Sequence, residues 1–145
     1  MSGFAGKRIL VTGGAGFLGG PLIRNLVERG ARPEDVTVPE YPRFDLRRPA
    51  DCADVVAGKD IVIHLAANAG GIGWNRAHPG ALFYDNASMG IHLMEESRKA
   101  GVKKFVQIGT VCAYPSSRRA SRSARMTSGR DIPSRPTPHT AWPRK

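Results

Sequence analysis

The sequence changes character at Pro115, and this change limits what the chain can fold into. Residues 1–115 alternate short apolar runs with amphipathic segments, whereas residues 116–145 are mostly Ser, Arg, Pro and Thr. A segment so poor in apolar side chains cannot bury enough surface to offset the entropy lost on ordering. We therefore expect one folded domain at residues 1–115, a length typical of a single domain, and a disordered tail at residues 116–145.

Most of the positive charge belongs to this expected tail. The tail carries +7 of the formal net charge of +10, because it holds eight basic residues and one acidic residue, Asp131. Strong basicity often indicates a nucleic-acid or anionic-membrane partner. Here the basic residues are not spread over a folded face, and Trp142 is the tail's one residue among Phe, Trp and Tyr that could stack on a base. The composition therefore argues against nucleic acid as the partner.

Cysteine content and hydropathy point to a protein of the cytoplasm. Cys52 and Cys112 are too few and too far apart for a disulfide framework or a metal cluster, so we expect no metal site and a buried, inert Cys52. The first residues do not resemble a secretion signal, and no apolar run approaches the ~20 residues needed to span a bilayer. The sequence predicts a soluble, unsecreted chain without a membrane partner.

Apolar runs and helical patterns alternate along residues 1–115. The continuous apolar run at residues 60–67 is typical of a strand buried on both faces. Strands that alternate with helices predict an α/β fold with a doubly wound parallel sheet and right-handed crossovers. The expected strands are residues 9–11, 36–38, 44–46, 60–67 and 104–108, and the expected helices are residues 22–29, 51–57 and 79–100, with a loop between residues 68 and 78.

The first strand is followed by a glycine-rich turn with the spacing Gly-x-x-Gly-x-x-Gly. Such a turn lets the backbone approach a pyrophosphate closely, packs the helix tightly on the strand, and directs the phosphates to the helix N-terminus. Three glycines in register in the first strand-to-helix turn predict a dinucleotide site. The candidate binding residues are Gly13, Gly14, Ala15, Gly16, Phe17, Leu18 and Gly19.

The choice between NAD and NADP depends on the next loop. An acidic residue about 20 positions beyond the last glycine would hydrogen-bond the adenosine ribose, and Glu40 has this position. Arg43 is close enough in sequence to favour a 2′-phosphate instead. Both residues can equally be solvated loop charges, so NAD and NADP both stay open.

Three stretches together resemble the extended short-chain dehydrogenase/reductase family of nucleotide-sugar epimerases, dehydratases and reductases: residues 11–19, 62–67 and 105–110. Residues 70–76, 83–86 and 109–115 are similar, more narrowly, to the GDP-L-fucose synthase type. The resemblance implies a Rossmann-type sheet, an NAD or NADP cofactor, and a nucleotide-sugar substrate, above all a GDP-sugar. It further implies 3,5-epimerisation and 4-reduction of a GDP-4-keto-6-deoxy sugar, and full-length relatives that are homodimers.

The resemblance also assigns roles to individual residues. Beyond the glycine turn, the implied cofactor residues are Asp45 and Leu46 beside the adenine, Leu65, Ala66 and Ala67 along the nicotinamide ribose, Asn86, which steadies the active site, and Gly109. Thr110 would hydrogen-bond the reacting sugar oxygen. Cys112 would act as acid and base in epimerisation, since a thiol with a pKa of about 8.5 can exchange a proton with a carbon beside a ketone when the site tunes it.

The family's Tyr-x-x-x-Lys pair is absent. Tyr41, Tyr84 and Tyr114 are followed four positions later by Asp, Ser and Arg. We therefore expect a cofactor-binding N-terminal portion, with an incomplete sheet and without activity of its own. The alternative is a non-catalytic NAD(P)-binding module whose basic tail binds nucleic acid.

A slipped reading frame would explain the missing pair. With suitable codons, reading from the last base of the His139 codon converts residues 140–145 into Tyr-Gly-Leu-Ala-Lys-Lys, which contains the pair. In the same register, residues 124–129 yield Glu-Asp-Asp-Leu-Trp, which also resembles the family. Two matches in one register and in the expected order support a frameshift just after Pro115.

Overall fold

The structure is a computed structural model that describes residues 3–109. These residues belong to one compact unit, which ends at Gly109. The expected domain boundary at residue 115, the tail at residues 116–145, and the two candidate catalytic residues Thr110 and Cys112 lie outside the described residues. Their assignments stay predictions.

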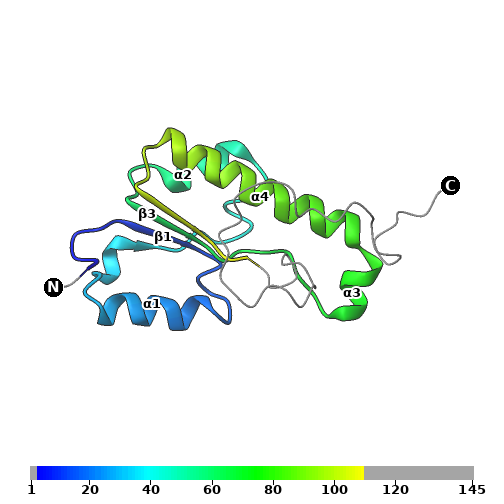
Figure 1. Ribbon diagram of the computed structural model, residues 1–145, viewed down its shortest axis with the longest axis horizontal. Helices are drawn as coiled ribbons and strands as arrows, with labels where there is room; N and C mark the ends of the chain where they lie inside the picture. Colours follow the sequence, from blue (N-terminus) through cyan, green and yellow to red (C-terminus); the bar gives the residue numbers. More distant parts are fainter. Residues whose placement is uncertain (1–2, 110–145) are drawn as a thin grey trace, which may run out of the picture. The chain divides into compact units, whose positions relative to one another are not determined.

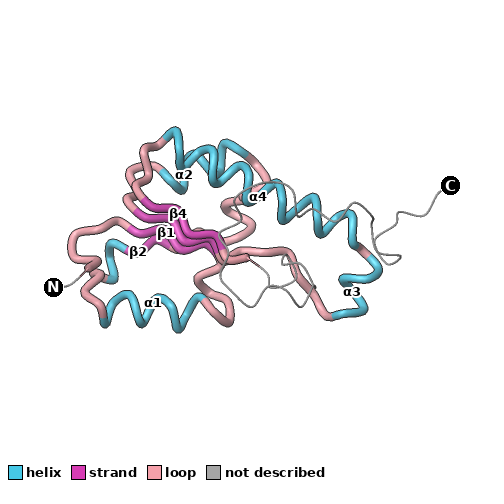
Figure 2. Tube along the Cα trace, in the orientation of Figure 1, coloured by secondary structure: helices cyan, strands magenta, loops and turns pink. Residues whose placement is uncertain are grey.

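The described residues build a parallel sheet of four strands: β1 (Ile9–Thr12), β2 (Val36–Thr37), β3 (Ile61–His64) and β4 (Lys104–Gln107). The strand order is β2-β1-β3-β4, and every pair is parallel (Figures 1 and 2). Ile9 lies opposite Ile61 and Thr12 opposite His64, so β1 and β3 end level with each other. The predicted parallel α/β fold is confirmed.

Helices cover both faces of this sheet, with α1 on one side and α2 and α4 on the other (Figure 1). They are α1 (Gly19–Glu28), the short 3₁₀ helix η1 (Pro33–Asp35), α2 (Pro49–Val56), α3 (Ile72–Ala77) and α4 (Pro79–Lys99). Gly30 has a left-handed φ of 96° just beyond α1, and the Ala31 N–H donates to the Leu26 carbonyl at 3.0 Å. This closing bond ends α1 where the glycine was expected to end it.

The core has two layers because successive strand residues point to opposite faces. Ile9, Val11 and Ile63 pack with Leu26 of α1. On the other face, buried residues of the sheet, of α2 and of α4 pack together: Leu10, Leu46, Cys52, Val55, Val56, Val62 and Leu93. The Cys52 thiol is fully buried and donates to the Leu46 carbonyl at 3.1 Å, as expected of an inert core cysteine.

Three expectations about the elements are wrong. Residues 44–46 form a loop, because the Asp45 N–H donates to the Asp51 carboxylate at 2.7 Å and not to a strand. The strand expected at residues 60–67 is limited to Ile61–His64: the Leu65 N–H is shared between the carbonyl and the hydroxyl of Thr12, and the Ala66 N–H donates to the hydroxyl and not to a strand. Residues 72–77 form the short helix α3 and not a loop, stabilised where the Trp74 ring stacks on His78 with centroids 3.9 Å apart.

Among the described helices, none combines the length and the apolar character required to cross a bilayer.

Candidate functional site

The carboxyl ends of β1 and β3 form the point where the order of the strands reverses. From β1 the chain continues to β2 on one side of β1. It then returns to form β3 on the other side of β1, and β4 adds next to β3. Open α/β sheets bind their ligands in the crevice outside the strand ends at such a switch point. The glycine turn follows β1, and Leu65, Ala66 and Ala67 follow β3. The topology therefore brings two of the predicted cofactor segments together.

The backbones of these two segments are in direct contact. Gly13 has a left-handed φ of 67°, and a Cβ added to it would lie 2.9 Å from the Ala66 nitrogen. A Cβ on Gly19 would collide with Gly13 and Gly14. The turn is tightened by the Gly16 N–H, which donates to the Gly13 carbonyl at 3.0 Å. Gly13 is therefore required by space and by conformation, and Gly19 by space.

The turn leads into the N-terminus of α1, which suits an anionic ligand. No acidic residue lies in the first turn of α1, and its N-cap residue Leu18 makes no side-chain cap bond. The helix dipole at such an end favours phosphate, while the Gly19 and Gly20 N–H groups themselves donate to the Gly16 carbonyl at 3.1 and 3.3 Å. Ala15, Gly16 and Phe17 are exposed, with Phe17 94% accessible, while Gly14 is buried against Val38. The residues present therefore fit a pyrophosphate.

A buried Thr–His pair joins the two strand ends. The Thr12 hydroxyl accepts the N–H groups of Leu65 and Ala66, each at 3.2 Å, and lies 2.6 Å from His64 Nδ1. Because two N–H donors occupy its lone pairs, the hydroxyl donates its own hydrogen to Nδ1. His64 is thus held neutral with its proton on Nε2, and burial lowers its pKa. The pair fixes the backbone of the predicted nicotinamide-ribose segment.

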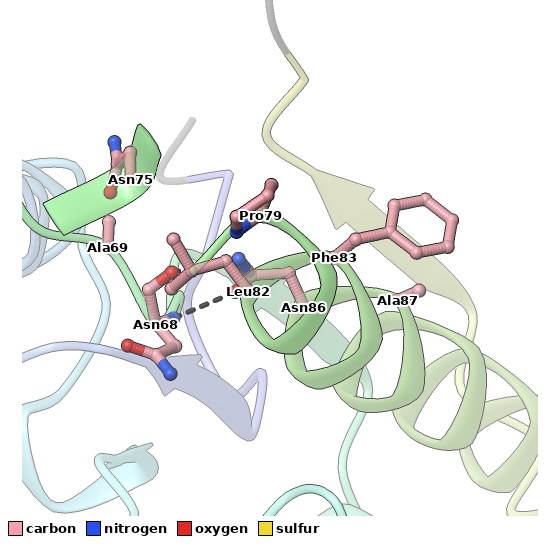
Figure 3. Close-up of a pocket in the computed structure, with 8 residues that line it drawn as sticks. All are labelled: Asn68, Ala69, Asn75, Pro79, Leu82, Phe83, Asn86 and Ala87. Atoms are coloured by element: carbon pink, nitrogen blue, oxygen red, sulfur yellow. Dashed lines mark hydrogen bonds between the residues drawn. The ribbon is translucent and has the colours of Figure 1, made fainter. Parts of the chain in front are cut away.

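Asn86, in the second turn of α4, clamps the loop that continues this segment. Its Oδ1 accepts the Asn68 N–H at 2.7 Å, and its Nδ2 donates to the Asn68 carbonyl at 2.8 Å (Figure 3). A solvated asparagine would make neither bond. The structure thus gives Asn86 a structural contact at the crevice, while its role in catalysis stays a prediction.

The loop before α2 carries the residues expected beside the adenine. Asp45 and Arg47 form a two-point pair, with Nε 2.9 Å from Oδ1 and Nη2 2.8 Å from Oδ2. The hydrogen bonds from Arg47 hold the pKa of Asp45 at about 2. The Leu46 side chain is buried in the core, so only its backbone can face a ligand. The adenine contacts themselves stay a prediction.

Glu40 and Arg43 both lie on the surface beyond β2. The Glu40 carbonyl accepts the Phe44 N–H at 3.0 Å, and the Arg43 guanidinium lies over the Phe44 ring, 5.2 Å from its centroid. In the described part of the chain, neither charged group forms an ion pair. NAD and NADP therefore stay open at this position.

A cavity of about 590 Å³ lies between the loop after β3 and the start of α4 (Figure 3). It is lined by Asn68, Ala69, Asn75, Pro79, Leu82, Phe83, Asn86 and Ala87. Its wall is mainly apolar, with three amide side chains, which is typical of a small-molecule site. Because Asn68 and Asn86 belong both to the cavity and to the clamp, the cavity adjoins the predicted nicotinamide end.

Sequence reasoning missed several residues that shape the site. Thr12, Arg47, Asn68 and Asp85 received no role, although their bonds fix three segments. The sequence offered one partial clue to these residues: Asp85 directly precedes Asn86 in the stretch that resembles the family. Gly109 follows Ile108, whose N–H donates to the His64 carbonyl at 3.4 Å, so it lies at the same sheet edge. Within residues 3–109, no group of three His, Cys, Asp or Glu side chains could hold a metal ion.

Comparisons with known proteins agree with this geometry. GDP-mannose 3,5-epimerase 1 from Oryza sativa subsp. japonica is 32% identical over 120 residues, which cover 74% of this chain and 32% of that protein. GDP-L-fucose synthase from Azorhizobium caulinodans is 32% identical over 113 residues, which cover 76% of this chain and 35% of that protein. The chain thus spans about a third of the length of these relatives.

A solved structure supports the fold. The GDP-mannoheptose C4 reductase from Campylobacter jejuni, with NADP bound, superimposes with a TM-score of 0.62 at 23% identity, covering 68% of this chain and 29% of that one. The model of the NAD dependent epimerase/dehydratase family matches residues 9–139, most of the chain. Together with the glycine turn at the switch point, this match establishes that the chain belongs to the NAD dependent epimerase/dehydratase family.

Proposed function

We propose that this chain is the cofactor-binding part of an NAD(P)-dependent epimerase/reductase that acts on a GDP-sugar, of the GDP-L-fucose synthase type. The observation that carries the proposal is the backbone contact between Gly13 and Ala66 at the switch point. The two curated relatives named above are both GDP-sugar enzymes by name, and the reductase structure holds NADP. These names favour a GDP-sugar over other nucleotide sugars.

In this proposal each segment has a distinct task. The glycine turn and the α1 N-terminus bind the pyrophosphate, Asp45 and the Leu46 backbone face the adenine, and residues 65–67 face the nicotinamide ribose. A bound nicotinamide cofactor would supply hydride transfer. Thr110 would hydrogen-bond the sugar's keto oxygen, and Cys112 would exchange the proton on the neighbouring carbon.

The proposal predicts cofactor binding without turnover. We expect the purified chain to quench or shift NADPH or NADH fluorescence on titration, and the tighter of the two identifies the cofactor. No reduction of a GDP-4-keto-6-deoxy sugar should follow, because the sequence lacks the Tyr-x-x-x-Lys pair. Failure of both dinucleotides to bind would refute the proposal, and robust turnover would refute the claim of incompleteness.

A further inference from the structure

Asp85 lies where three parts of the predicted cofactor site meet. Its side chain comes from α4, is 16% exposed, and presents Oδ2 to two neighbours. Asn68 Nδ2 donates to Oδ2 at 2.8 Å, and Arg47 Nη1 lies 3.4 Å from the same oxygen. Asn68 follows β3, whereas Arg47 belongs to the loop between β2 and α2. One carboxylate therefore contacts loops from two different crossovers.

Both loops are otherwise held firmly close to this carboxylate. Apart from its bond to Asp85, Asn68 is fixed at two points, since Asn86 bonds its N–H and its carbonyl. Arg47 is fixed by its two bonds to Asp45. If the Asn68 loop shifts relative to Asp85, the residues expected beside the nicotinamide ribose shift with it. If the Arg47 loop shifts, Asp45, which is expected beside the adenine, shifts with it.

We propose that Asp85 is a positioning residue that sets the adenine half of the cofactor site at the correct distance from the nicotinamide half. This inference rests on the proposed function, and it adds a residue to which sequence reasoning gave no role. A dinucleotide needs both halves at one fixed spacing, whereas a half-ligand needs only its own half. The affinity for the whole cofactor should therefore depend on Asp85 more than the affinity for either half.

The chemistry of the contacts supports this division. An isolated ion pair between exposed groups contributes little, and Arg47 is 39% exposed. The hydrogen bond from Asn68 is charge-assisted and its acceptor is mostly buried, so it is the stronger contact. Asp85→Asn keeps an oxygen that can accept from Asn68 but removes the charge that faces Arg47. This variant separates the two contacts.

The test measures the Kd of the 145-residue chain for NADPH, NADH, ADP and reduced nicotinamide mononucleotide. Asp85→Ala should raise the Kd for the tighter dinucleotide about tenfold, the worth of a hydrogen bond to a charged group, with Kd for ADP and for the mononucleotide within about twofold of wild type. Asp85→Asn should fall between wild type and Asp85→Ala. Glu95→Gln is the matched control, because Glu95 is an acidic residue of α4 that pairs with Arg98 and Lys99 of the same helix and contacts neither loop through these pairs.

Each result decides between distinct conclusions. Unchanged dinucleotide affinity in Asp85→Ala overturns the positioning role and leaves the proposed function standing. Equal weakening of the dinucleotide and both half-ligands also overturns it, because a general structural defect acts on all three. A wild-type chain that binds neither dinucleotide removes the proposed function and this inference together. If Asp85→Ala does not fold, Asp85→Asn combined with Arg47→Met carries the test, and independent, additive effects of these two changes contradict it.

Discussion

At the scale of single residues, the buried Thr12–His64 pair makes stability depend on pH. Burial lowers the pKa of His64 below its ordinary value of 6.5 in the folded chain. Below that value the unfolded chain binds a proton that the folded chain does not. The stabilising contribution is therefore complete above pH 6.5 and is lost as the pH falls from there through the folded-state pKa, by at most about 1.4 kcal/mol per pH unit.

The measurement is urea unfolding at pH values of about 7.5 and about 5.5. Wild type should lose more free energy of unfolding between them than His64→Asn, whose side chain can accept from Thr12 without titrating. Carboxylates that titrate in this range are shared by both proteins and cancel in the comparison. Equal losses of unfolding free energy in the two proteins would show that the pKa of His64 is not lowered in the folded chain.

Cys52 gives a second prediction at this scale. Burial, aided by nearby carboxylates, raises the pKa of its thiol to about 12, so almost no reactive thiolate exists near neutral pH. In a Cys112→Ser background, which leaves Cys52 as the only cysteine, a disulfide reagent should label the native chain very slowly and the urea-unfolded chain at once. Rapid stoichiometric labelling of the native chain would contradict the packing around α2.

At the scale of elements, the glycine turn and α1 depend on adjacent glycines that have different surroundings. A Cβ on Gly19 meets the backbone of Gly13 and Gly14, whereas the nearest atom to a Cβ on Gly20 is Arg24 Nη1 at 3.8 Å. Gly19→Ala should cost about 1–3 kcal/mol of stability through overpacking and weaken binding of the tighter dinucleotide more than tenfold. Gly20→Ala should be neutral or gain up to about 1 kcal/mol from helix propensity.

Thermal unfolding and fluorescence titration of the two variants check this prediction. The pair is well matched, because both changes add one methyl group at the start of the same helix. Loss of binding in both variants would show that the α1 N-terminus tolerates no methyl group at all. Unchanged binding in Gly19→Ala would show that the turn does not approach the ligand.

Elements with a strong pattern were predictable from the sequence, and those set by tertiary contacts were not. The apolar spacing placed α4 within one residue of its observed ends, Pro79 and Lys99, and found β1 and β3. The helix α3 was missed because its glycine-rich surroundings are typical of a loop. In the site, the glycine turn was found from local spacing. The Arg47–Asp85 contact joins residues 38 positions apart and leaves no local signal.

At the scale of the whole molecule, the described unit holds the predicted cofactor crevice, while the family's Tyr-x-x-x-Lys pair is absent from the translated chain. The family match extends to residue 139, and thus beyond Pro115, where we place the change of frame. The two identified relatives match only 74% and 76% of the chain. A frameshift therefore has to be tested in the nucleotide sequence itself.

The coding DNA should contain an open alternative frame beyond the Pro115 codon that encodes Glu-Asp-Asp-Leu-Trp and then Tyr-x-x-x-Lys. If that frame also encodes the remaining two thirds of the relatives' length, restoring it should yield a protein that oxidises NADPH or NADH in the presence of a GDP-4-keto-6-deoxy sugar, while the present chain does not. Changing the restored tyrosine to Phe should abolish that turnover and spare cofactor binding, because the tyrosine passes a proton and does not hold the pyrophosphate. Stop codons in the alternative frame would exclude the frameshift and leave residues 116–145 as the native sequence.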